Sequence, residues 1–136
     1  MKKAQSITLA ILMTGAWLLA HGNVTPQSVD TKNLPKVEKD LIHNPYRGNT
    51  EAFNIGKDGY EGNCARCHGI EAISGGIAPD LRYLEKGDEG DEYFIDIVKA
   101  GVVRNGNVYM PPFKEVLSAE AMWAIRTYIE KLHTTE

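Results

Sequence analysis

The chain has 136 residues with 15 Lys and Arg against 18 Asp and Glu, so its net charge is −3 at pH 7. This acidic balance excludes the class of proteins that bind nucleic-acid phosphates through a basic surface. The length suits one compact domain and is too short for two. With only two cysteines and four scattered histidines, a structural zinc site with its usual four ligands is disfavoured.

The amino terminus has the form of a secretory signal peptide. Lys2 and Lys3 precede an apolar run over residues 7–20, which is too short for a convincing membrane span. We expect a signal peptide over residues 1–22, cleaved after residue 20 or 22, and a location in the periplasm; an uncleaved anchor is the alternative. The mature chain would keep 13 basic and 18 acidic residues, which gives a net charge of −5.

Residues 23–45 carry three prolines among polar residues and show little apolar periodicity, which predicts an extended arm. A domain over residues 46–136 follows. Its first helix is predicted near residues 49–62, where small and aromatic residues recur at helical spacing. Gly56 in this helix invites a close helix crossing, with Tyr128 of the last helix as its expected partner.

Residues 64–68 read Cys-Ala-Arg-Cys-His, which is the attachment pattern of c-type haem. Cys64 and Cys67 can form thioethers with the two vinyl groups on one porphyrin edge, and His68 can then place an imidazole nitrogen on the iron. We therefore expect one covalently bound haem c. A thioredoxin-like pair is disfavoured because no alternating strand precedes Cys64. A structural disulfide would close a loop too small to constrain the unfolded chain.

The rest of the chain is predicted to consist of loops and two helices, without strand pairing. Residues 69–80 are rich in Gly and Ile and are expected to loop around the haem. A second helix is predicted over residues 91–100 and should end at Gly101. The acidic residues near its start lack the ligand spacing of a calcium loop and are expected to cap and solvate this helix. Ser118 is a good N-cap for the last helix, whose apolar residues recur at helical spacing over residues 122–132.

The sixth iron ligand decides what the haem can do, and Met110 is our candidate for it. It comes 42 residues after His68, in a predicted loop directly before two prolines that stiffen the chain. A thioether ligand stabilises the reduced iron and raises its potential relative to a second histidine. Met122 is expected in the core of the last helix. His43 and His133 are expected in solvent and remain weak candidates for a second histidine ligand.

Two residues near the end of the 69–80 loop are expected to support the site. A ligating histidine usually donates its other ring proton to an acceptor that fixes its orientation, and the Pro79 carbonyl is our candidate. Arg82 could bind a haem propionate through its guanidinium; a solvated surface arginine is the alternative. Three aromatic side chains are expected to pack in the core or wall the haem: Tyr83, Tyr109 and Trp123.

The chain resembles the class I cytochromes c over about residues 49–133. The resemblance rests on the first helix, the Cys-x-x-Cys-His run, Pro79-Asp80-Leu81, the Met-Pro loop and the aromatic last helix. It is closer still to the small periplasmic cytochromes c that accept electrons from PQQ-dependent alcohol dehydrogenases. Four stretches carry that closer match: residues 44–49, 74–82, 104–113 and 123–128.

The resemblance implies an all-α class I cytochrome c fold wrapped around one haem, with Cys64 and Cys67 as attachment residues and His68 and Met110 as iron ligands. These are the four residues that the motif and the Met-Pro loop already pointed to. It further implies a one-electron carrier without catalytic residues. We expect a quinoprotein alcohol dehydrogenase as donor, a terminal oxidase or another cytochrome as acceptor, no stable membrane insertion, and a monomer. The alternatives are a haem enzyme or gas sensor with a labile sixth ligand, and a bound cytochrome subunit of another dehydrogenase.

Overall fold

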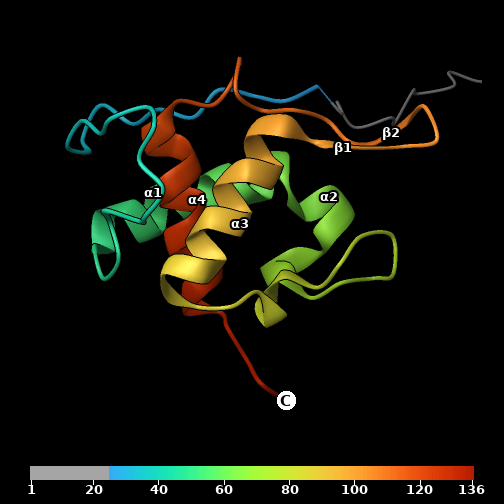
Figure 1. Cartoon of the computed structure of the whole chain (residues 1–136). Helices are drawn as coiled ribbons and strands as arrows, with labels where there is room; N and C mark the ends of the chain where they lie inside the picture. The colour runs from blue at the N-terminus through green and yellow to red at the C-terminus, as the bar shows by residue number, and fades with distance from the viewer. Residues whose placement is uncertain (1–24) are drawn as a thin grey trace, which may run out of the picture.

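The computed structural model describes residues 25–136, in which the Cys-x-x-Cys-His segment lies at one side of the longer helices (Figure 1). The predicted signal peptide, residues 1–22, lies outside the described residues. The helices are α1 (Thr50–Asn63), α2 (Ala65–His68), α3 (Gly87–Ala100) and α4 (Ala119–Lys131), with short 3-10 turns at Ile70–Ala72 and Leu81–Tyr83. Two strands, β1 (Val102–Arg104) and β2 (Asn107–Met110), form an antiparallel pair. Within the described residues, no helix is long and apolar enough to cross a membrane.

Helices α1 and α4 begin where the sequence indicates. The Asn49 side chain accepts a hydrogen bond from the Ala52 amide, and the Ser118 side chain accepts one from the Ala121 amide. Each cap satisfies an amide that has no partner inside its own helix. The last predicted helix is thereby confirmed, and its central residues form much of the hydrophobic core.

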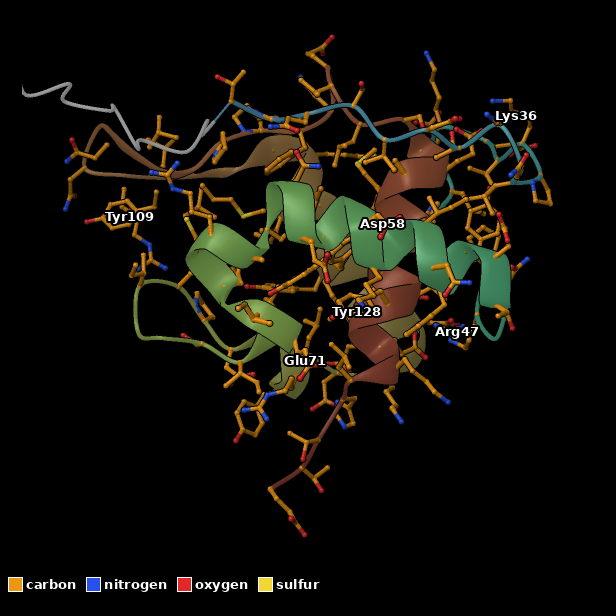
Figure 2. The ribbon with its side chains drawn as sticks, turned by 180° about the vertical axis from the view of Figure 1, so that it is seen from behind. Lys36, Arg47, Asp58, Glu71, Tyr109 and Tyr128 are labelled. Atoms are coloured by element: carbon orange, nitrogen blue, oxygen red, sulfur yellow. The ribbon has the colours of Figure 1, made fainter. Side chains whose placement is uncertain are left out.

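The close helix crossing at Gly56 is confirmed, but its partner is not the predicted one. A Cβ atom at Gly56 would lie 1.9 Å from the backbone oxygen of Ala124, so the backbones of α1 and α4 are in direct contact there. Tyr128 lies one turn further along α4 and packs its ring against Phe53 and Tyr60, at centroid distances of 5.5 and 5.3 Å (Figure 2). The prediction was wrong because a helix crossing this close needs a small partner residue.

The β1–β2 pair corrects two expectations. The sequence showed no strand pairing, and Met110 was expected in a loop, whereas Met110 is the last residue of β2 and pairs with Val102. No residue of either strand is buried, and the partners Val103 and Val108 are 62% and 64% exposed, so the alternation that reveals a half-buried strand is missing. The four α-helices otherwise agree with the all-α prediction.

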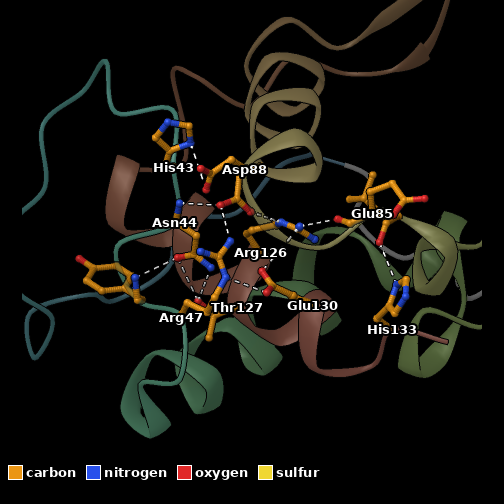
Figure 3. A network of polar contacts seen from close by, with 12 residues as sticks. His43, Asn44, Arg47, Glu85, Asp88, Arg126, Thr127, Glu130 and His133 are labelled. Atoms are coloured by element: carbon orange, nitrogen blue, oxygen red, sulfur yellow. Dashed lines mark hydrogen bonds and ion pairs between the residues drawn. The ribbon is translucent and has the colours of Figure 1, made fainter.

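Helix α3 starts four residues earlier than predicted and, as expected, ends at Ala100 directly before Gly101. Asp88 and Glu89 lie in its first turn, where carboxylates favour the positive end of the helix. Asp91, however, is not solvated. It is fully buried and accepts hydrogen bonds from Arg126 at 2.7 Å, Arg47 at 2.6 Å and the Asn44 amide at 2.8 Å (Figure 3).

Residues 25–45 contain no helix or strand, yet they lie against the helices (Figure 1). Leu34 is buried in the common core with 5% of its surface exposed. The Val37 amide donates to the Glu120 carboxylate at 3.2 Å, and the Gln27 amide donates to the Asn63 side chain at 2.7 Å. The described part of the arm therefore belongs to the same packed unit as α1 and α4.

Substitution of Gly56 by alanine should destabilise the α1–α4 crossing. The added methyl group would overlap the Ala124 backbone, and overpacking of this kind typically costs about 1–3 kcal/mol. Gly62→Ala is the matched control, because nothing lies within 4 Å of its Cβ position in the same helix. The control should stabilise the protein by roughly 0.5–1 kcal/mol through helix propensity. Chemical denaturation measures both; equal midpoints for the two variants would contradict this account of the crossing.

Candidate haem site

The Cys-x-x-Cys-His residues begin directly where α1 ends. Cys64 closes α1 through a 2.8 Å hydrogen bond from its amide to the Tyr60 carbonyl, and its own carbonyl accepts the amides of Cys67 and His68 at 3.1 and 3.0 Å. The two thiols therefore lie one helical turn apart. Burial raises the pKa of the Cys64 thiol to about 12, and the nearby Cys67 adds to the shift. Cys67 is exposed and Cys64 is partly buried.

The chain leaves α2 through a turn that only glycine tolerates. Gly69 has a φ of 85°, and a Cβ atom there would lie 1.8 Å from the Ile73 carbonyl oxygen. The Tyr60 hydroxyl donates a 2.8 Å hydrogen bond to the Gly69 carbonyl, and burial raises the pKa of this phenol well above its usual range. Tyr60 thus ties the exit of the segment back to α1. The sequence does not predict this contact, because no local pattern links the Tyr60 hydroxyl to Gly69.

The His68 imidazole is oriented from the far side of the following loop. Its Nδ1 lies 2.8 Å from the Pro79 carbonyl oxygen. Since a carbonyl can only accept, Nδ1 carries the proton, and the unprotonated Nε2 is left free to bind a metal. This is the contact that the sequence analysis expected between these two residues.

Arg82 lies directly beyond this contact and pairs with Asp80. Its Nε lies 3.0 Å from Asp80 Oδ1, and its Nη2 lies 2.7 Å from Asp80 Oδ2. The two side chains are 27% and 17% exposed. The guanidinium is therefore anchored rather than freely solvated, and its remaining N–H groups are the ones that a propionate would have to use.

The β1–β2 pair fixes the position of Met110. The pair returns the chain to the end of α3, where Gly101 adopts a φ of 71° and a Cβ atom would lie 2.5 Å from the Met110 carbonyl oxygen. Three residues later, the Phe113 amide donates to the Val98 carbonyl at 2.9 Å. These contacts fix the backbone on both sides of the half-buried Met110. Figures 1 and 2 both show α2 and the β1–β2 pair on the same side of the molecule.

The other methionine and aromatic candidates separate into core and surface. Met122 and Trp123 are buried in α4, with 4% and 1% exposed. Tyr83 is exposed and its hydroxyl donates to the Glu136 carbonyl at 2.6 Å. Tyr109 is also exposed, and the Arg104 guanidinium lies 5.7 Å from its ring centroid. Met122 is thus a core residue, as expected.

The two histidine candidates each have a neighbour outside the Cys-x-x-Cys-His segment. His133 Nδ1 lies 3.1 Å from the Leu84 carbonyl oxygen, and His43 Nδ1 lies 3.4 Å from an Asp88 carboxylate oxygen. His43, Asp88 and Asp91 come close enough to suggest a metal site. Both oxygens of Asp91 are already occupied by Arg47, Arg126 and a backbone amide, so this group is an ion-pair network (Figure 3).

The donor set around α2 fits a covalently attached haem. Two thiols one turn apart suit the two vinyl groups of a haem, and an imidazole with its Nδ1 already engaged would offer Nε2 to the iron. The Met110 thioether would supply a soft ligand that stabilises reduced iron. None of these residues is engaged in another ion pair or disulfide in the described structure. Cys64, Cys67 and His68 would therefore be the residues that hold the haem on the α2 side.

Comparison with known proteins places the chain in a family. The model of the family described as cytochrome C oxidase, cbb3-type, subunit III matches residues 51–129. Cytochrome c550 of Pseudomonas aeruginosa is 50% identical over 135 residues, which cover 96% of this chain and 93% of that protein. The chain belongs to the c-type cytochromes. As a c-type cytochrome it carries covalently bound haem c and transfers electrons.

Parts of larger enzymes also match this cytochrome. Quinohemoprotein alcohol dehydrogenase ADH-IIG of Pseudomonas putida is 37% identical over 102 residues, which are 75% of this chain and 12% of that enzyme. The dehydrogenase subunit of the quinone-type alcohol dehydrogenase of Gluconobacter oxydans is 31% identical over 125 residues, or 89% of this chain and 16% of that subunit. No solved structure matches the chain significantly.

Replacement of both Cys64 and Cys67 by serine should abolish covalent haem attachment, because serine cannot form the thioethers. The test is acid extraction of the purified protein followed by the visible spectrum of the protein fraction. Each single variant is a control and should retain haem through its remaining thioether. Haem that stays with the double variant after extraction would show that attachment uses other residues.

Proposed function

We propose that this c-type cytochrome is a periplasmic carrier of single electrons, with Cys64 and Cys67 as haem attachment residues and His68 and Met110 as iron ligands. The observation that carries the proposal is the His68 imidazole, which the Pro79 carbonyl holds by Nδ1 at 2.8 Å with Nε2 left for iron. The placement of α2 and β2 on the same side of the molecule supports Met110 as the second ligand.

Two protein ligands on the iron would decide the type of reaction. A substrate could reach the metal only by displacing His68 or Met110, so the haem serves as a one-electron Fe(II)/Fe(III) couple. The protein's task is then to keep the two ligands in place in both oxidation states. The backbone next to His68 is fixed by Gly69 and Tyr60, and the backbone of Met110 is fixed by its close approach to Gly101.

A quinoprotein alcohol dehydrogenase is the donor that the comparisons favour. Segments similar to this chain occur within enzymes that are named quinohemoprotein alcohol dehydrogenases. A separate cytochrome of the same kind is suited to accept electrons from a quinone-dependent dehydrogenase that lacks its own haem segment. We propose that it passes them to a terminal oxidase or another cytochrome, and that it acts as a monomer.

The surface near α2 and the β1–β2 pair suits brief contacts with such partners. Several large apolar side chains are exposed in the two segments that flank the proposed ligands: Ile70, Ile73, Ile77, Val103, Val108 and Tyr109. Exposed apolar groups of this kind mark interaction surfaces. Encounters in electron transfer usually bury little area, which permits rapid dissociation after each electron.

The donor assignment is tested by mixing the oxidised cytochrome with a substrate-reduced PQQ-dependent alcohol dehydrogenase in a stopped-flow instrument. We expect bimolecular reduction with a rate constant above about 10⁶ M⁻¹ s⁻¹. The rate constant should fall as salt is added, because salt screens the attraction between the acidic carrier and a basic patch on its partner. The dehydrogenase without PQQ is the control. The assignment fails if a chemical reductant reduces the haem but the loaded enzyme does not; a complex that stays together during purification would instead indicate a bound subunit.

Met110→Ala should open the sixth coordination position. Loss of the thioether removes the ligand that favours reduced iron, so the reduction potential should fall, on the order of 0.1 V given the range that axial ligands span. Met122→Ala is the control, since Met122 lies in the core of α4 and should change stability while leaving the potential in place. An unchanged visible spectrum and potential in Met110→Ala would exclude Met110 as a ligand.

A further inference from the structure

The Pro79 carbonyl that orients His68 lies in a segment with little regular structure. Between α2 and α3 the chain forms only two short 3-10 turns, at Ile70–Ala72 and Leu81–Tyr83. Pro79 itself is exposed. A carbonyl in such a loop keeps a fixed position only if other contacts hold the loop closed, so the residues around Pro79 decide how firmly His68 is oriented.

One carboxylate closes this loop from both sides. Asp80 Oδ2 accepts the Ser74 amide at 3.2 Å, and Asp80 Oδ1 accepts the Arg82 amide at 3.0 Å. The Ser74 hydroxyl in turn donates to the Ala78 carbonyl and accepts the Gly76 amide at 3.0 Å. The backbone is thereby held on both sides of Pro79.

Arg82 holds that carboxylate in place. Its Nε and Nη2 donate to the two oxygens of Asp80 at 3.0 and 2.7 Å, which is the two-point geometry that makes arginine–carboxylate pairs specific. The Arg82 guanidinium also keeps the pKa of Asp80 well below its usual range, so the carboxylate is charged at neutral pH. The pair therefore stays assembled whenever the cytochrome is at work.

We propose that Asp80 and Arg82 form a clamp that positions the Pro79 carbonyl against His68 Nδ1 and so sets the reduction potential of the haem. They are positioning residues, because they act on the ligand through the loop backbone. The inference rests on the proposed role of His68 as an iron ligand. A strong hydrogen bond to Nδ1–H makes the imidazole a more basic ligand, which favours Fe(III) and lowers the potential.

Asp80 and Arg82 have opposite charges, so the signs of the potential shifts in their variants distinguish a positioning effect from a direct charge effect. Loss of the negative charge of Asp80 would raise the potential, whereas loss of the positive charge of Arg82 would lower it, if charge alone mattered. Loss of the clamp weakens the same hydrogen bond in both cases. Positioning therefore predicts an upward shift in the Asp80 variant and in the Arg82 variant.

The experiment compares haem-loaded Asp80→Asn and Arg82→Gln with the wild-type protein. The first readout is the reduction potential. The second is the exchange rate of the His68 Nδ1 proton with solvent, measured by NMR on the reduced protein. We expect both variants to raise the potential and to speed this exchange about tenfold, which corresponds to losing roughly one hydrogen bond's net strength. Ser74→Ala tests the loop without any change of charge and should shift both readouts in the same direction.

Asp30 and Lys32 provide a matched control in the arm. They have the same spacing in the sequence, the Lys32 amide donates to Asp30 at 3.0 Å, and the side chains pair at 3.1 Å, but both are exposed. Asp30→Asn and Lys32→Gln should leave both readouts unchanged.

The clamp proposal fails if the two variants shift the reduction potential in opposite directions and leave the proton exchange rate unchanged. The pair would then act on the haem through its charges alone. A wild-type His68 ring without the resonance shifts of a haem ligand would overturn the proposed ligand set, and the clamp with it. The two failures are therefore distinguished by the wild-type spectrum.

Discussion

The backbone contact between Gly56 of α1 and Ala124 of α4 is the constraint on which the rest of this cytochrome depends. It fixes the axis of α1, and α1 runs directly into Cys64, so the crossing also fixes where the haem attachment residues begin. Tyr60 extends this control by one more step, because its hydroxyl ties the Gly69 carbonyl to the same helix. A haem bound at α2 would thus be anchored to a helix that packs in the hydrophobic core.

The second proposed ligand is held by different means. Met110 is not in a helix; it ends β2, and the close approach permitted by Gly101 presses its backbone against the end of α3. The loop that carries Pro79 is held by side chains, chiefly the Asp80–Arg82 pair. The proposed site therefore combines a helical anchor with a strand end and a loop whose positions depend on a few contacts. We therefore expect small changes in those contacts to move the proposed iron ligands without unfolding the domain.

Local signals predicted the first and last helices and the haem motif, but they placed the start of α3 four residues too late and gave few long-range contacts. Ser118 and the apolar spacing of α4 gave the last helix, and the Cys-x-x-Cys-His run gave the cofactor from five residues. The β1–β2 pair was missed because both of its faces are exposed, which removes the alternation that marks a strand. Asp91 was expected in solvent because its partner Arg126 lies 35 residues away, and no local pattern links the two. The Gly56 crossing was found, but its partner residue depends on how α4 is rotated about its axis.

The most direct test of this account is whether the iron is closed by protein ligands on both sides. The oxidised protein should show the weak near-infrared band that reports a methionine–iron bond, and the reduced protein should not bind carbon monoxide. Both results together would establish the closed site on which the electron-carrier function rests. Ready binding of carbon monoxide by the reduced protein, with the near-infrared band missing from the oxidised form, would contradict it and indicate a haem enzyme or gas sensor.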